Sequence, residues 1–170
     1  MTWTAGVSGF GPLQLEKLGI LGEGVSQLNE QIYESFHRVL SDVRQQVDED
    51  IFWNWDGRLQ AAVLVVKTAN SRILNESLAS SFENRWDIES IQGAPGHVRE
   101  VVEALSGLRE RQFIYTNSPT ESGSMLYAAY WPWTNGDLIS VRVSMLLKDR
   151  QSLSSEQQIE LLNQTLSSNH

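Results

Sequence analysis

Residues 124–147 read SMLYAAYWPWTNGDLISVRVSMLL, two runs of strand-forming residues on either side of Asn135-Gly136. Asn-Gly between such runs is the strongest short signal for a tight β-hairpin. A two-residue turn there would pair Thr134 with Asp137, so that paired residue numbers sum to 271. Because side chains alternate between the two faces of a strand, this register assigns every side chain of the hairpin to a face.

The two faces of this predicted hairpin differ in composition. One is apolar throughout and should face the core, with Leu126, Ala128, Tyr130 and Pro132 opposite Met145, Val143, Val141 and Ile139. The other is mixed, with Met125, Tyr127, Ala129, Trp131 and Trp133 opposite Leu146, Ser144, Arg142, Ser140 and Leu138. Large exposed aromatic patches mark binding sites, so something should cover this face. A helix of the same chain, a partner subunit, and a small ligand stacked on Trp131 are the three alternatives.

Aromatic residues and arginine on the mixed face are the first candidates for an interface. Tyr, Trp and Arg dominate binding hot spots, which selects Tyr127, Trp131, Trp133 and Arg142. Trp53 and Trp55 are added because their spacing places both rings on one face of a strand. For this second pair, packing within the sheet competes with a stacking platform for sugars or nucleobases.

Hydrophobic periodicity predicts the helices and strands that precede the hairpin. A long amphipathic helix is expected over 25–47, ending before the acidic run Asp48-Glu49-Asp50. Residues 51–57 indicate a strand that enters a turn at Asp56-Gly57, and 59–69 indicate a strand with helix as the alternative. Further segments are predicted as a helix over 71–84, a helix over 97–108, a strand over 112–116 and a C-terminal helix from Ser154.

These elements predict an α+β fold. An antiparallel sheet of about four or five strands, centred on the 124–147 hairpin, should pack with the long N-terminal amphipathic helix and two or three further helices. Six glycines in the first 24 residues disfavour a long helix there. We therefore expect a Gly-rich N-terminal arm over 1–24 and a single domain over 25–170.

Composition excludes several classes of function. The chain has 170 residues, a formal charge of −8 and no cysteine. An acidic chain is a poor phosphate-backbone binder, so no nucleic-acid partner is expected. The lack of cysteine removes disulfides, thiolate zinc sites and cysteine nucleophiles. No secretory leader and no apolar run of about 20 residues is seen, which predicts no membrane association and a cytoplasmic or virion setting.

Catalytic signatures are weak. None of His37, His97 and His170 has the spacing of a helical zinc pair, and His37 lies off the main apolar stripe, where we expect it to be solvated. His97 near a helix N-terminus is conceivable as a general base. The glycine clusters lack the remaining residues of a phosphate-binding loop, and Asp48, Glu49, Asp50 and Asp56 do not fit a calcium loop. We expect no catalytic residue, no metal and no cofactor.

The leading hypothesis is a non-enzymatic interaction or assembly subunit, an adaptor or a component of a larger particle such as a virion tail or neck. Its partner would be another protein or copies of itself. A small acidic inhibitor or immunity-type protein that binds a basic enzyme surface is the second hypothesis, based on the negative charge. A ligand-sensing domain with an aromatic platform is the third.

Overall fold

A six-stranded antiparallel sheet forms the centre of the protein, as the computed structural model shows for residues 26–47, 51–121, 123–146 and 160. The order across the sheet is β1-β2-β6-β5-β4-β3. The strands are β1 (Asn54–Asp56), β2 (Ala61–Lys67), β3 (Asn84–Trp86), β4 (Phe113–Thr116), β5 (Met125–Pro132) and β6 (Leu138–Leu146). The α+β class is therefore confirmed, with slightly more strands than the four or five expected.

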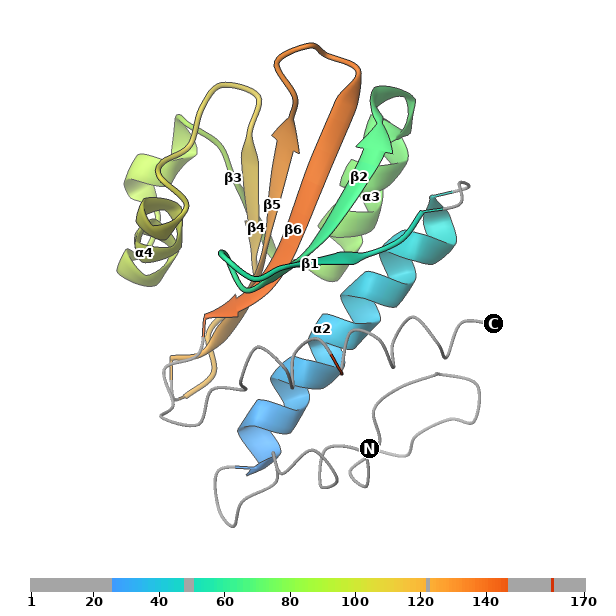
Figure 1. Ribbon diagram of the computed structural model, residues 1–170. Coiled ribbons are helices and arrows are strands. Elements are labelled where there is room, and N and C mark those ends of the chain that lie inside the picture. The colour runs from blue at the N-terminus through green and yellow to red at the C-terminus, as the bar shows by residue number, and fades with distance from the viewer. Residues whose placement is uncertain (1–25, 48–50, 122, 147–159, 161–170) are drawn as a thin grey trace.

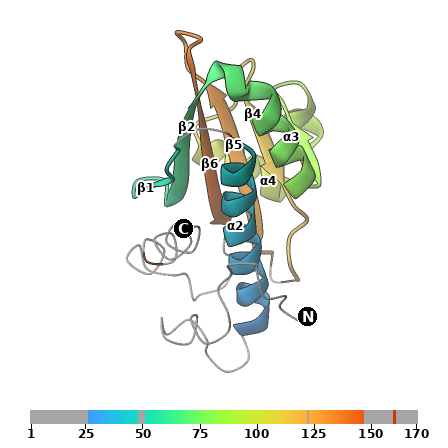
Figure 2. The same ribbon diagram turned by 90° about the vertical axis from the view of Figure 1, so that its right-hand side faces the viewer.

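Helices cover both sides of this sheet. The long helix α2 (Ser26–Gln46) and helix α3 (Ser71–Ser81) lie on one side, and α4 (Gly96–Ala104) lies on the other (Figure 1). Turning the molecule brings α2 and α3 in front of the strands (Figure 2). We call the face toward α2 and α3 the front face and the face toward α4 the back face. Two short 3₁₀ segments, Thr68–Asn70 and Ser90–Gly93, precede α3 and α4.

The main core lies between the front face and the two helices. It contains the side chains that the hairpin register assigned to the apolar face, except Pro132, which is partly exposed. The apolar stripe of α2, which includes Phe36, Leu40 and Val43, packs with them. From α3 it takes Leu74 and Leu78, which recur four residues apart and so share one helical face. Burial of these side chains is the principal source of stability, at about 25 cal/mol per Å² of apolar surface.

The hairpin has the predicted register but a different turn. Met125 pairs with Leu146 and Pro132 with Ile139, which keeps the paired numbers at a sum of 271. Gly136 N–H donates to Trp133 O at 3.0 Å, so the chain reverses within the four residues 134–137 and not within two. Gly136 has φ +78°, whereas Asn135 does not adopt a positive φ, and a type I′ turn requires both.

Residues 61–67 form a strand, which settles the choice between strand and helix. β2 pairs with β1 on one side and with β6 on the other, so its Val-rich sequence sits between two neighbours. The sequence did not predict β3, a strand of only three residues that pairs with β4. Helix α3 ends at Ser81, three residues earlier than expected, because Phe82 is extended. Helix α4 ends at Ala104, and Ser106 and Gly107 follow it with left-handed φ values.

Several predictions fall outside the part of the chain that the structure describes. They are the Gly-rich arm over 1–24, the acidic run 48–50 and, apart from residue 160, the C-terminal helix predicted from Ser154. Among the described residues, no helix has the length and apolar character needed to cross a membrane.

Candidate functional site

Helix α4 covers only part of the back face. Val98 and Val101 of α4 pack on Met125 and Tyr127 of β5, and Val102 packs with Ile114 and Ala129. Tyr127 is consequently 8% exposed. Burial raises the pKa of the Tyr127 hydroxyl above its usual value, so it stays protonated. The half of the back face over β3, β4 and the start of β5 is therefore closed by the chain itself.

Among the described residues, no helix closes the other half of the back face, over β2, β6 and the end of β5. Val65 is 41% exposed and Trp133 is 45% exposed, although both are large apolar side chains. Val63, Trp131, Leu138 and Arg142 are partly exposed beside them. We call these six residues the open patch: Val63, Val65, Trp131, Trp133, Leu138 and Arg142.

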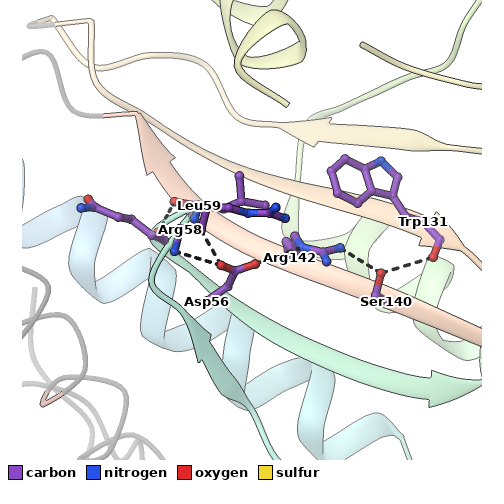
Figure 3. Close-up of polar contacts among 8 residues, drawn as sticks. Asp56, Arg58, Leu59, Trp131, Ser140 and Arg142 are labelled. Carbon is purple, nitrogen blue, oxygen red and sulfur yellow. Dashed lines mark hydrogen bonds and ion pairs between the residues drawn. The ribbon is translucent and has the colours of Figure 1, made fainter. Parts of the chain in front are cut away.

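Arg142 occupies the middle of the open patch. In the ladder it lies between Ala129 of β5 and Val63 of β2. Its guanidinium carbon lies 4.7 Å from the centroid of the Trp131 ring, within the range of a cation–π contact. Its Nη1 donates to Ser140 Oγ at 3.0 Å, and its Nε lies 3.7 Å from Asp56 Oδ2 (Figure 3). The side chain therefore lies flat across the sheet, between an aromatic ring and a carboxylate.

The turn between β1 and β2 positions Asp56. Its Oδ1 accepts hydrogen bonds from the backbone N–H groups of Arg58 (3.0 Å) and Leu59 (3.3 Å). The turn closes through Gln60 at φ +48°, whose carbonyl accepts a hydrogen bond from Ser144 Oγ at 2.7 Å. The Asp-Gly turn predicted at 56–57 thus does more than reverse the chain, because it places a carboxylate at the margin of the open patch.

Burial is the largest influence on the pKa of Arg142 and lowers it from its usual value. The Asp56 carboxylate opposes this shift, whereas the nearby Arg58 adds to it. Arginine stays protonated even so, because its usual pKa is far above physiological pH. The open patch accordingly contains a permanent positive charge that is held in a partly desolvated site.

The structure brings together three of the six predicted interface residues. Trp133 and Arg142 lie on the open part of the back face, and Trp131 lies at its boundary, where its ring also packs against the cluster under α4. Tyr127 shares the face but lies under α4. Trp53 lies in the main core, where its Nε1 donates to Leu40 O at 3.0 Å, and Trp55 packs against the same core. For the Trp53–Trp55 pair the structure thus favours packing within the fold, the alternative to a stacking platform, and we exclude both residues from the open patch.

Sequence reasoning missed two valines and one aspartate of this region. Val63 and Val65 alternate with the core residues Ala62, Leu64 and Val66, a period-two pattern that was visible in the sequence. This pattern assigns Val63 and Val65 to the face opposite the core only if 59–69 is a strand, and the sequence left helix as an alternative. Asp56 was considered from the sequence only as part of an acidic cluster with residues 48–50. No local pattern predicts its contact with Arg142, which comes from a strand distant in sequence.

The prediction for His37 was wrong. The side chain is 3% exposed, and it shares a buried stripe of α2 with Tyr33 and Ser41 at intervals of four residues. Burial, with a smaller contribution from Arg38, lowers the pKa of His37 to about 4. His97 is the second residue of α4 and is partly exposed. Within the described ranges, no group of three or more His, Cys, Asp or Glu side chains is placed to hold a metal ion.

Hollows elsewhere on the molecule are lined by other residues. A polar one of about 470 Å³ lies between α2 and the end of α3, with Arg38, Asp42, Glu83 and Asn117 in its wall. Burial raises the pKa of the Asp42 carboxyl, and Arg38 opposes this. A smaller one of about 220 Å³ lies on the front side near Thr68, Arg111 and Tyr130. Neither hollow contains a pair of groups that is arranged as a nucleophile and base.

Comparison of the chain with protein-family models, with curated proteins and with solved structures finds no match in any of the three.

Proposed function

We propose that the protein is a non-enzymatic subunit of a larger assembly and that the open patch is its contact surface for other protein chains. The observation that carries this proposal is the exposure of Val65 and Trp133 on a sheet half that α4 leaves uncovered. Sheet faces that pack on the chain's own helices bury such residues, as the front face does. Burying them against a second chain removes apolar surface from water and favours association.

The composition of the open patch fits a protein contact. Two tryptophans and an arginine lie beside aliphatic side chains, and these residue types concentrate the binding energy of interfaces. A small ligand stacked on Trp131 is less well supported, because Arg142 already covers one side of that ring at 4.7 Å. The inhibitor hypothesis was based on the net charge and the acids at 48–56. Of those acids only Asp56 lies among the described residues, and it is engaged by two backbone amides and by Arg142.

Light scattering of the full chain at about 50 µM tests this proposal, because stable interfaces associate at or below such concentrations. We expect a mass above that of the monomer for the natural sequence and a return to monomer for Val65→Glu combined with Trp133→Glu. Ile88→Glu is the matched control, since Ile88 is equally exposed (45%) but lies outside the open patch. A monomer at this concentration contradicts assembly from copies of this chain, and an oligomer that the double variant leaves intact contradicts the role of the open patch.

A further inference from the structure

The guanidinium of Arg142 has fewer partners than its donors allow. A guanidinium carries five N–H groups, and a buried one is usually matched by a bidentate carboxylate. Among the described residues, Arg142 makes one hydrogen bond, to Ser140 Oγ at 3.0 Å. The 3.7 Å separation of its Nε from Asp56 Oδ2 is too long for a hydrogen bond, and this Nε is buried without an acceptor. Hydrogen-bonding capacity therefore remains unused at the middle of the open patch.

Asp56 is poorly placed to supply the missing acceptors. Its Oδ1 already accepts the backbone N–H groups of Arg58 and Leu59, which hold the carboxylate in the turn. Moving the carboxylate toward Arg142 would break these bonds and leave two turn amides without their acceptor. The turn thus holds the Asp56 carboxylate 3.7 Å from the Arg142 Nε.

The guanidinium is nevertheless held in a fixed place and is reachable from outside. The guanidinium carbon of Arg142 lies over the Trp131 ring, and Ser140 accepts one of the guanidinium hydrogens (Figure 3). The strand of Arg142 lies in the middle of the sheet. The side chain is 19% exposed, so part of it faces solvent. A preorganised arginine of this kind loses little conformational freedom when it binds an anion.

The surroundings define what kind of anion fits. Arg58 and Lys67 are exposed on the same side of the sheet, and Asp56 is the carboxylate that contacts Arg142, so this region is locally positive on a chain whose net charge is −8. Val63, Val65 and Trp133 make the rest of the region apolar. A ligand that complements both properties combines a carboxylate with apolar side chains on either side of it.

We infer that the open patch binds an acidic protein segment by placing one Asp or Glu carboxylate on Arg142 while the flanking apolar side chains cover Val63, Val65 and Trp133. This inference rests on the proposed function, because it names the chemistry of the partner for the same surface. It commits to a protein segment and not to a free anion, since a free anion would leave the valines and Trp133 exposed.

The test compares two blocked peptides, Ac-Val-Glu-Val-NH₂ and Ac-Val-Gln-Val-NH₂, titrated into the full natural chain. Binding is followed by ¹⁵N NMR through the indole N–H of Trp131, assigned with Trp131→Phe, and the Nε–H of Arg142. We expect the Glu peptide to bind about tenfold more tightly than the Gln peptide, as one charge-assisted hydrogen-bonded pair would give. Equal affinities, or equal shifts with acetate at the same carboxylate concentration, overturn the inference.

Two variants separate recognition of a carboxylate from a structural role of the Asp56–Arg142 pair. Asp56→Asn keeps an oxygen for the turn amides but removes the competing charge, so the Glu peptide should bind about two- to fivefold more tightly. A loss of binding in Asp56→Asn overturns the inference. Arg142→Gln should reduce Glu-peptide binding to the level of the Gln peptide, and an unchanged affinity would likewise overturn it. Arg72→Gln is the control, since Arg72 is an exposed arginine of α3 that pairs only loosely with Glu76.

These results are distinguishable from failure of the proposed function. Oligomers that depend on Val65 and Trp133, together with equal peptide affinities, would keep the assembly role and reject the acidic segment. A monomeric chain that prefers the Glu peptide would reject assembly of copies and keep the carboxylate recognition.

Discussion

The covered and the open halves of the back face belong to one sheet and meet on β5, yet they differ in how far their side chains are buried. Tyr127 and Trp133 lie on one side of β5 and its extension, six residues apart, and only Tyr127 is under α4. The alternation of side chains that places both on this face is the same. What differs is the reach of a nine-residue helix that spans only part of the sheet. An aromatic residue on a sheet face therefore acquires its role from the neighbouring layer and not from the strand that carries it.

Truncating one aromatic residue in each half gives the largest expected contrast. Tyr127→Ala should lower the free energy of unfolding by about 3 kcal/mol, because it leaves a cavity under α4. Trp133→Ala should cost about 1 kcal/mol or less, because nearly half of the side chain is already in water. Urea unfolding followed by circular dichroism measures both. Similar losses for the two variants would show that the halves do not differ in packing as described.

Lowering the pH should show whether the covered and the open half unfold as one cooperative unit. The folded protein keeps His37 neutral down to a pH of about 4, whereas the unfolded chain protonates it near pH 6.5. Between these values the unfolded state binds the extra proton, so the stabilisation is complete above pH 6.5 and is lost as the pH falls toward 4. The loss should reach roughly 2–3 kcal/mol.

Hydrogen exchange of backbone amides in β4, under the covered half, and in β6, under the open half, measures this response in each half separately. Both halves should lose protection together, because both strands contribute side chains to the main core that includes α2. The variant His37→Gln is the control and should flatten the pH dependence between pH 6.5 and 4. Loss of protection confined to one half would show that the sheet is not a single cooperative unit.

Two neighbouring valines of β2 allow the core and the open patch to be compared within one strand, with the smallest expected difference in stability. Val66 points into the main core and Val65 points into the open patch. Val66→Thr buries a hydroxyl of nearly the same volume and should cost about 1–2 kcal/mol, whereas Val65→Thr should stay within about 0.5 kcal/mol. Thermal unfolding of the two variants measures the difference. A large loss for Val65→Thr would mean that this side chain is covered in solution.

The hairpin could be predicted from the sequence because local rules determine it. Period-two alternation and a turn signal at Asn135-Gly136 were enough to predict the register and both faces. The register is as predicted although the turn is of another type. Thr68 helps to hold that turn by donating to the carbonyls of Gly136 and Asp137 from a segment 68 residues away. No local sequence pattern predicts such a contact.

The extent of the open patch could not be predicted in the same way. It depends on where α4 lies, and α4 is followed by β4, which brings it over β3 to β5 through pairings distant in sequence. The prediction that His37 is solvated failed for a related reason. Its stripe with Tyr33 and Ser41 contains polar residues, so hydrophobic periodicity alone assigned it to solvent.

The outermost strands β1 and β3 have three residues each. A second chain that adds a strand to a sheet pairs with the exposed backbone N–H and C=O groups of an edge strand. Both edge strands of this sheet are short, so they offer few such groups. Growth of the sheet sideways into fibrils is therefore disfavoured. If the proposed assembly forms through the open patch, its copies would stack face to face, and side chains rather than backbone ladders would set their order.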